Sequence, residues 1–479
     1  MAANTPGNLL ILALVFGTLT GLIAWVYNTY FEFLLWLVWE WAPIHVVQPS
    51  LRRTAGSYSW FPEADKVAWL YTLLVTTCLG TLAGVTQRLL GSPGDLPETV
   101  RCIHEKGSIP IRTAPSMFIC SAFSIAAGGS LGPEAALLAL CGSSVSFVAK
   151  HVFGFQGQKL RNCALMGMTA GLAAFFGVAL GGSLFALEVL HRTGLQFYEV
   201  ATYAVATGTI CLVVFRALSG LPFGSIWDFQ TADPSVLDYR HVLVGVLMGM
   251  VAAVAAIVFM KLHAVIKWVI ESTGLQEHHT PILSGLSGGL LIGVIGVLCP
   301  PTLFWGEYEI QTLADPSHPL PHIWPKGGVY GLDPFRQGDY TFWLYLLIAG
   351  AKFVAISISV LSGFRGGFIF PLFFAGTALG HAISSIPGVP FISSLSPVML
   401  CMPVAAGLNS AITRTPFSTS LILAILSGHP EVTVPCLASS LVALFLTLDF
   451  PFILSQRDRQ DIIIKEIELL DEDGNPGGV

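Results

Sequence analysis

The chain has 479 residues, of which 53% are hydrophobic and 11% are charged, and its formal net charge is −6. A soluble domain has roughly 25% charged residues, so this composition excludes a large soluble domain, and no basic surface for nucleic acid is present. The sequence instead predicts an all-α, multi-pass integral membrane protein, because apolar segments long enough to cross a lipid bilayer recur along it. We expect these segments at residues 8–41, 66–90, 115–149, 162–190, 198–221, 241–271, 281–300, 341–362, 366–388, 396–427 and 431–455.

The two ends of the chain and its cysteines set further limits. Residues 1–8 form a short N-terminal tail without Lys or Arg, so a cleaved signal peptide is not expected. Residues 457–479 form an acidic C-terminal tail that we expect to be solvated. The nine cysteines show no Cys-x-x-Cys spacing and predict neither a disulfide framework nor a metal site. No nucleotide-binding or other cofactor signature is present, so we expect no cofactor.

Three segments rich in Gly and Pro interrupt the apolar pattern, at residues 91–97, 128–136 and 363–371. Each is predicted to end one helix and to begin another. A helix N-terminus carries unpaired N–H donors and partial positive charge, so helix starts that meet inside a membrane bind an anion without a full positive charge. Glycines in these segments would let the ion approach the backbone closely. These pathway glycines are Gly132, Gly366 and Gly367.

Glu134 is the only acidic residue in the apolar stretch 128–142, and it directly follows Pro133. A charged side chain at the centre of a bilayer costs about 2.5–3.5 kcal/mol or more, so an acid at this position is a candidate functional residue. We interpret Glu134 as the gate of an anion path. The alternative is a structural acid paired with a buried cation such as Lys352 or Arg414.

Two sequence blocks recur in the same order and predict an internal repeat. Ala170-Gly-Leu172 resembles Ala406-Gly-Leu408, and the block at Gly132 resembles the block at Gly367. Inverted repeats with broken helices are a recurrent architecture of transporters, with the site between the halves. The alternative is that Gly- and Ala-rich helices resemble one another through composition alone. The predicted boundaries are a transmembrane domain over 9–456, with repeats at roughly 9–181 and 198–456.

The motifs together resemble those of the CLC family of chloride channels and anion/proton antiporters. Gly132-Pro-Glu-Ala-Ala136 is similar to the family's Gly-Arg-Glu-Gly-Pro motif, although it lacks the Arg and the final Gly-Pro. Gly366-Gly-Phe-Ile-Phe-Pro371 closely matches a Gly-Gly-x-Phe-x-Pro-like motif. Pro93-Gly-Asp-Leu-Pro-Glu98 is the most similar to Gly-Ser-Gly-Ile-Pro and places Gly94 where the family has an anion-binding Ser. Ser108 is a second, minor candidate for that position.

Carried over by position, the resemblance implies an anion pathway through the protein. Glu134 would be the gating glutamate, and the backbone amides of Phe368 and Ile369 would bind the anion. The family's pore Tyr falls near Ile453, which has no hydroxyl group to donate. The resemblance further implies a homodimer with one pathway per subunit and dimer faces near 172–217 and 417–440. It implies no cytoplasmic CBS domains, because the chain ends soon after residue 456.

The resemblance also bears on the choice between a channel and an antiporter. Antiporters of the family usually carry a second acid that relays protons, and that position falls on Val189, next to Glu188. Because Val cannot hold a proton, we expect a CLC-type voltage-gated chloride channel, with a chloride/proton antiporter as the alternative. Glu188 is expected to satisfy the N-terminus of a neighbouring helix.

An enzyme is the most distant alternative. Gly285-Leu-Ser-Gly288 matches a pattern of intramembrane serine proteases, and His381 lies in another apolar segment. Gly- and Ser-rich helix contacts produce such tetrapeptides without catalysis, so no enzymatic activity is expected. Asp95 is expected to be the N-cap of the helix that follows it.

Overall fold

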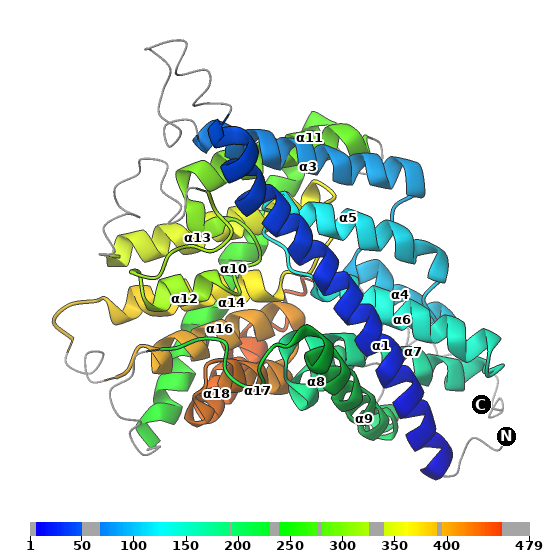
Figure 1. Cartoon of the computed structure of the whole chain (residues 1–479). Coiled ribbons are helices and arrows are strands. Elements are labelled where there is room, and N and C mark those ends of the chain that lie inside the picture. Colours follow the sequence, from blue (N-terminus) through cyan, green and yellow to red (C-terminus); the bar gives the residue numbers. More distant parts are fainter. Residues whose placement is uncertain are drawn as a thin grey trace.

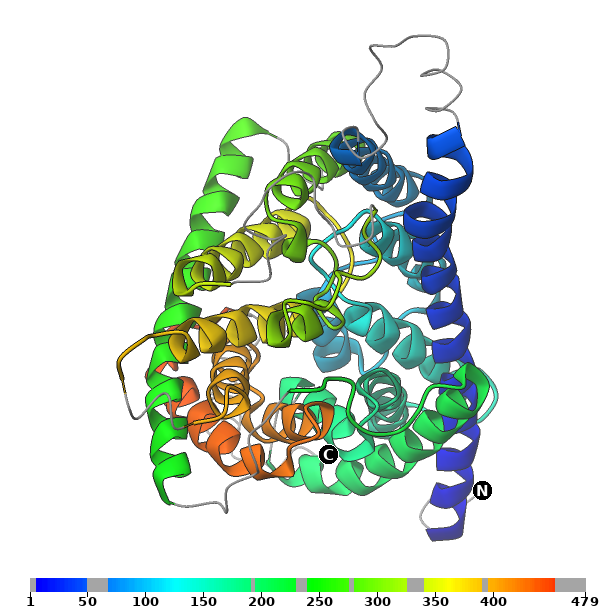
Figure 2. The same cartoon turned by 60° about the vertical axis from the view of Figure 1, so that its left-hand side comes forward.

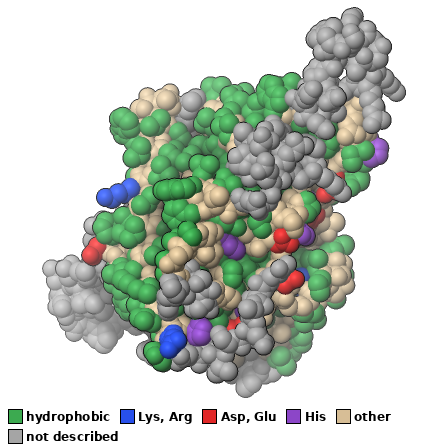
Figure 3. All heavy atoms as spheres, turned by 90° about the vertical axis from the view of Figure 1, so that its left-hand side faces the viewer, with side chains coloured by type: hydrophobic (Ala, Val, Ile, Leu, Met, Phe, Trp, Pro, Cys, Tyr) green, Lys and Arg blue, Asp and Glu red, His purple; other side chains and the backbone are tan. Residues whose placement is uncertain are grey.

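The computed structural model describes residues 6–49, 68–190, 194–229, 239–274, 280–324, 340–389 and 395–452. Over these ranges the chain is helical, with one isolated β-bridge and no strand, which confirms the predicted all-α class (Figure 1). Six of the described helices are long and apolar enough to cross a membrane. Figure 3 shows a face of the molecule on which hydrophobic side chains predominate and charged ones are few.

The helices fall into two successive groups along the chain. The first group is α1 (Pro6–Leu35), α3 (Ala68–Leu90), α4 (Leu96–Lys106), α5 (Ala114–Ala126), α6 (Glu134–His151), α7 (Gly157–Phe176), α8 (Ala179–Leu190) and α9 (Gly194–Ser219). The second group is α10 (Tyr239–Thr273), α11 (Pro281–Leu298), α12 (Glu309–Ala314), α13 (Phe342–Leu361), α14 (Ile369–Ser384), α16 (Val398–Thr413), α17 (Pro416–Leu426) and α18 (Thr433–Leu446). The long helices α1 and α10 lie on opposite sides of the molecule, with most other helices between them (Figure 2).

Helix breaks occur at all three predicted interruptions. The breaks separate α3 from α4, α5 from α6, and α13 from α14. The apolar segments 162–190 and 396–427 are also broken, which the hydrophobic pattern did not reveal. The first breaks at Gly177, whose φ of 68° ends α7 in the left-handed region. The second breaks at Arg414, whose φ is 63°, just before Pro416 begins α17.

Small residues let the broken helices pack closely. α3 packs against α11 along glycines, so that a Cβ added at Gly80 would lie 2.5 Å from the carbonyl oxygen of Gly285. α14 packs against α16 in the same way, since a Cβ at Gly376 would contact the backbone of Ala405. Such contacts between small residues are typical of helix packing in membranes.

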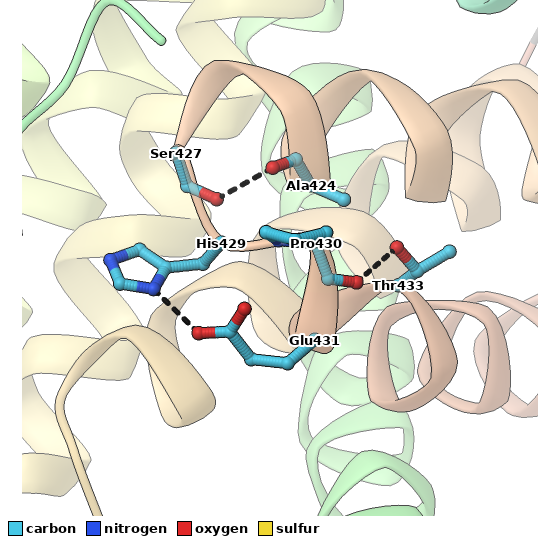
Figure 4. Close-up of polar contacts among 6 residues, drawn as sticks. All are labelled: Ala424, Ser427, His429, Pro430, Glu431 and Thr433. Carbon is cyan, nitrogen blue, oxygen red and sulfur yellow. Dashed lines mark hydrogen bonds and ion pairs between the residues drawn. The ribbon is translucent and has the colours of Figure 1, made fainter. Parts of the chain in front are cut away.

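The connection between α17 and α18 is short and held by polar contacts (Figure 4). His429 Nδ1 lies 2.6 Å from Glu431 Oε1, and the hydroxyl of Thr433 donates a hydrogen bond of 2.6 Å to the carbonyl of Pro430. This connection lies within residues 417–440, one of the two segments expected to form a dimer face.

Replacing Gly285 with Ala should weaken the packing of α3 on α11, because the added methyl group has no space beside Gly80. Overpacking of this kind costs about 1–3 kcal/mol. We expect the midpoint of thermal unfolding in detergent to fall. The matched control is Gly350→Ala in α13, where a Cβ would meet no atom within 4 Å. Equal midpoints for both variants would contradict the close packing of the two helices.

Candidate functional site

Two of the predicted helix breaks meet inside the protein through a pair of backbone hydrogen bonds. The amide of Gly132 donates to the carbonyl of Gly367 at 2.6 Å, and the amide of Gly367 donates to the carbonyl of Gly132 at 2.7 Å. These bonds form the isolated antiparallel bridge. α6 begins two residues after Gly132, and α14 begins two residues after Gly367. Two helix N-termini from different parts of the chain are therefore held side by side.

Glu134 connects these two helix starts. Its side chain is only 1% exposed, and its Oε1 accepts a hydrogen bond of 3.1 Å from the amide of Phe370 in the first turn of α14. Its Oε2 is buried and has no hydrogen-bond partner among the described residues. The amides of a first helical turn have no partner within their own helix and attract negative charge. The carboxylate therefore occupies a place at which a free anion would be stabilised.

The absence of side chains at two glycines makes room for the carboxylate. A Cβ at Gly367 would lie 2.6 Å from Glu134 Oε2, and a Cβ at Gly132 would overlap the same oxygen. Gly366 is equally constrained, since its Cβ would lie 2.7 Å from the carbonyl oxygen of Gly132. All three predicted pathway glycines thus lie at the bridge, and two of them directly border the carboxylate.

A cavity of about 600 Å³ approaches this site. Its lining includes Gly94, Gly366 and Phe368, so the structure brings together three positions that the sequence singled out separately. Gly94 has a φ of 82°, which favours glycine. Ser108 lies beyond the opposite end of α4, after Lys106. The ionisable residues of the lining are Asp95, His263, Lys267, Glu271 and Arg365.

The predicted anion-binding backbone lies at the start of α14. Phe368 is the N-cap residue, and Ile369 is the first residue of the helix. The amide that binds Glu134 belongs to the following residue, Phe370, which sequence reasoning missed. The motif would have pointed to this amide had the helix start been placed at Ile369, because the first-turn amides are the ones left free.

Ile453, the predicted counterpart of the pore Tyr, lies outside the described residues. Its neighbour Phe452 lines the cavity, and its ring meets that of Phe368 edge to face at a centroid distance of 5.6 Å. The cavity is therefore apolar at this point. Phe452 was not identified from the sequence.

The predicted proton-pathway residues lie on α8, away from the bridge. The carboxylate of Glu188 accepts hydrogen bonds from the amides of Phe417 and Ser418, at 3.1 and 3.0 Å, and from the hydroxyl of Ser418. Glu188 therefore caps the N-terminus of α17, as expected of it. Val189 is buried.

The cations proposed as alternative partners of Glu134 are engaged elsewhere. Lys352 donates to the carbonyls of Thr302 and Phe304, at 3.1 and 2.8 Å. Arg414 donates to backbone carbonyls around the end of α18, at Leu444, Thr447, Leu448 and Phe450. The salt-bridge alternative for Glu134 is therefore wrong, because its hydrogen bond comes from a backbone amide.

The structure also describes Asp95 and the two residues of the protease-like pattern. Asp95 caps α4, as predicted, by accepting a hydrogen bond of 2.8 Å from the amide of Glu98. In the tetrapeptide that resembles a protease motif, Ser287 donates to the carbonyl of Ser284 in its own helix. The ring of His381 stacks on those of Phe229 and Tyr345.

Comparison with known proteins identifies the family. The family model described as voltage gated chloride channel, Voltage_CLC, matches residues 72–448. The chain is 26% identical over 385 residues to a chloride/fluoride channel protein of Pseudomonas syringae pv. tomato, covering 78% of this chain and 76% of that protein. It is 24% identical over 482 residues to the H⁺/Cl⁻ exchange transporter ClcA of Salmonella agona, covering 92% and 87%.

The fold has solved counterparts as well. The crystal structure of a slow cyanobacterial Cl⁻/H⁺ antiporter superimposes with a TM-score of 0.70 and 18% sequence identity, covering 94% of this chain and 98% of that one. The chain belongs to the CLC family of anion-transport proteins, as the motifs implied, and it is a multi-pass integral membrane protein.

The contact between Gly367 and Glu134 predicts a coupled effect on stability. Gly367→Ala should destabilise the protein by about 1–3 kcal/mol, because the new methyl group overlaps the carboxylate. In a Glu134→Ala background the same substitution should cost much less, since the overlapping oxygens are gone. A double-mutant cycle of unfolding midpoints measures this coupling. Equal effects of Gly367→Ala in both backgrounds would show that the carboxylate lies elsewhere.

Proposed function

We propose that the protein exchanges chloride, or another small inorganic anion, for protons across a membrane, with Glu134 as the gating acid. The observation that carries this proposal is the buried carboxylate bound to the amide of Phe370 at the start of α14. An ionised carboxylate competes with a free anion for these amides. A protonated carboxyl group is neutral and gives up the position more readily. Anion entry and proton uptake therefore act on the same few atoms.

The cavity supplies the approach to this gate. An anion reaching Phe368 from the cavity meets the N-terminal end of α14, where the amides of Phe368 and Ile369 are our proposed ligands. Gly94 borders the same cavity, and its missing side chain leaves space for an ion. The role of Ile453 as an anion-binding residue remains a prediction, because Ile453 lies outside the described residues. No full positive charge is required at the gate itself, which suits rapid release.

Exchange is our preferred mechanism, although the sequence alone favoured a channel. That preference rested on one position, Val189, which cannot carry a proton. Two of the three similar proteins are named as an H⁺/Cl⁻ exchange transporter and a Cl⁻/H⁺ antiporter, and these names support exchange. Glu134 can itself take up and release a proton, so exchange requires only another route to it. We propose that transport involves no enzymatic reaction and no cofactor.

A CLC-type voltage-gated chloride channel is the second candidate, favoured by one specific observation. Glu188, the acid next to Val189, is committed to capping α17 through three hydrogen bonds. An acid held in this way is a poor proton relay, because protonation would weaken the cap. A protein without a proton-relay acid at position 188 or 189 is expected to conduct anions passively. The name of the Pseudomonas relative also supports this candidate.

We propose a homodimer in which α8, α9, α17 and α18 form the contact. Apolar side chains on these helices are exposed in the single chain, including Leu180, Val213, Phe417 and Phe445. Apolar surface of this kind suits either lipid or a second copy, and the resemblance to the family favours the second copy.

Replacing Glu134 with Gln separates the two transported species. The amide side chain of Gln does not take up or release a proton as a carboxyl group does, so we expect chloride-driven proton uptake to be lost while anion flux continues. The measurement records chloride efflux and proton uptake together from liposomes that contain the purified protein. Wild-type protein that moves chloride without protons would favour the channel. Wild-type protein that moves no anion at any pH would refute both candidates.

Replacing Glu188 with Gln distinguishes a capping acid from a proton relay. If Glu188 only caps α17, the variant should keep its ratio of protons to chloride and lose about 0.5–2 kcal/mol of stability. The same liposome assay and a thermal melt provide both readouts. Loss of proton uptake with unchanged anion flux would instead identify Glu188 as part of the proton pathway.

A further inference from the structure

Lys352 of α13 is a fully buried ammonium group that the proposed mechanism leaves unused. It is 0% exposed, donates to the carbonyls of Thr302 and Phe304, and lies 4.7 Å from the ring centroid of Phe374. Burying a charge is costly unless it is paired and hydrogen-bonded, and charged residues inside a membrane protein are usually functional. Its contacts therefore call for an explanation.

The two carbonyls bound by Lys352 belong to a backbone in an unusual conformation. Phe304 has a φ of 59°, a value that bulky side chains rarely adopt. Such conformations persist only where the surrounding structure holds them, and they gather at functional sites. Here the carbonyl of Phe304 is held by Lys352 at 2.8 Å. Its amide donates to the carbonyl of Gly128 at 3.1 Å.

Gly128 begins the loop that leads to the gate. This loop, residues 128–133, ends where Glu134 begins α6. The loop is tied to α13 at a second point, because the amide of Ser130 donates to Ser359 Oγ at 3.0 Å. Lys352 and Ser359 are seven residues apart, about two helical turns, so both lie on one face of α13. One helix face thus holds the loop both directly and through Phe304.

Glu309 supplies the counter-charge. It is 1% exposed, lies in the first turn of α12 and interacts electrostatically with Lys352. Neither carboxylate oxygen makes a well-formed hydrogen bond with a described residue, although the amides of Gly306 and Glu309 itself lie nearby. The other titratable group that acts on Lys352 is the buried Cys299. Of these two groups, Glu309 acts more strongly on Lys352.

We propose that Lys352 is a positioning residue for anion transport, acting through Phe304 on the loop before Glu134, with Glu309 as its counter-charge. This inference rests on the proposed function of Glu134. Removal of the ammonium group releases the carbonyl of Phe304, and its backbone can then leave the left-handed region. Gly128 loses a donor, and the loop moves more freely. The carboxylate of Glu134 is then held less firmly against the amide of Phe370.

The first test compares Lys352→Met with the double variant Lys352→Met/Glu309→Gln. The single variant leaves Glu309 buried without its partner, so lost stability alone would not be informative. The double variant removes both charges and should recover stability. We expect it to retain faster amide hydrogen exchange across residues 128–133, by about tenfold, and a shifted pH profile of anion flux. The double variant could instead show the wild-type rate of amide hydrogen exchange and the wild-type pH profile of anion flux. That result would reduce the pair to a structural role and overturn the proposal.

A second pair of variants tests the loop attachment without altering a charge. Ser359 and Ser357 are both buried and both donate to the carbonyl four residues earlier, but only Ser359 accepts from Ser130. We expect Ser359→Ala to speed exchange at the amide of Ser130 by about tenfold, and Ser357→Ala to leave it unchanged. Equal rates of amide hydrogen exchange at Ser130 in the two variants would contradict the attachment of the loop to α13. Amide hydrogen exchange can be measured whether or not the protein transports anions. A wild-type protein without anion transport would therefore refute the proposed function, while the hydrogen-exchange result would still report on the attachment of the loop.

Discussion

The reciprocal hydrogen bonds between Gly132 and Gly367 are the constraint on which the site depends. Each bond satisfies a backbone group at a break in a helix, where no helical partner exists. Inside a membrane such groups cannot form hydrogen bonds with water, so leaving them unpaired would cost several kcal/mol each. The same bonds bring the starts of α6 and α14 together. The placement of Glu134 on the amide of Phe370 follows from this arrangement.

Side chains complete the pairing of backbone groups around the breaks. Gln87 of α3 donates to the carbonyl of Gly363, at the end of α13, at 2.5 Å. The hydroxyl of Ser124 accepts from the amide of Arg365 at 3.0 Å. Ser359 serves Ser130 in the same way. Non-helical backbone is tolerated at membrane depth because neighbouring helices supply such partners. Backbone groups of Ser130, Gly363 and Arg365 at the breaks are therefore paired by side chains of neighbouring helices.

Local sequence signals predicted the breaks and singled out the buried acid Glu134. Gly and Pro act on the residues beside them, and an isolated acid such as Glu134 is visible in any apolar stretch. The alignment of Gly132 with Gly367 joined two positions that the structure pairs directly. The similarity of the motifs to the CLC family supplied the family and the fold.

The remaining features depend on contacts between distant residues. No sequence pattern indicates that Lys352 holds Phe304, because a loop and a helix meet there only after folding. It also did not show that Phe452 would line the cavity beside Phe368. The preference for a channel came from a single valine, and one position is weak support for a mechanism that involves several groups.

The distance along the chain between Glu134 and its partner has a consequence for biosynthesis. The carboxylate is made 236 residues before the amide that binds it. At a synthesis rate of roughly 5–20 residues per second, this delay is roughly ten to fifty seconds. During that time α6 has no α14 to meet, and an ionised carboxylate inside the bilayer would be unfavourable. The nascent chain must keep this acid protonated, near water or shielded by the translocation machinery until the second half arrives. The contact between Glu134 and Phe370 therefore cannot form until the start of α14 has been made.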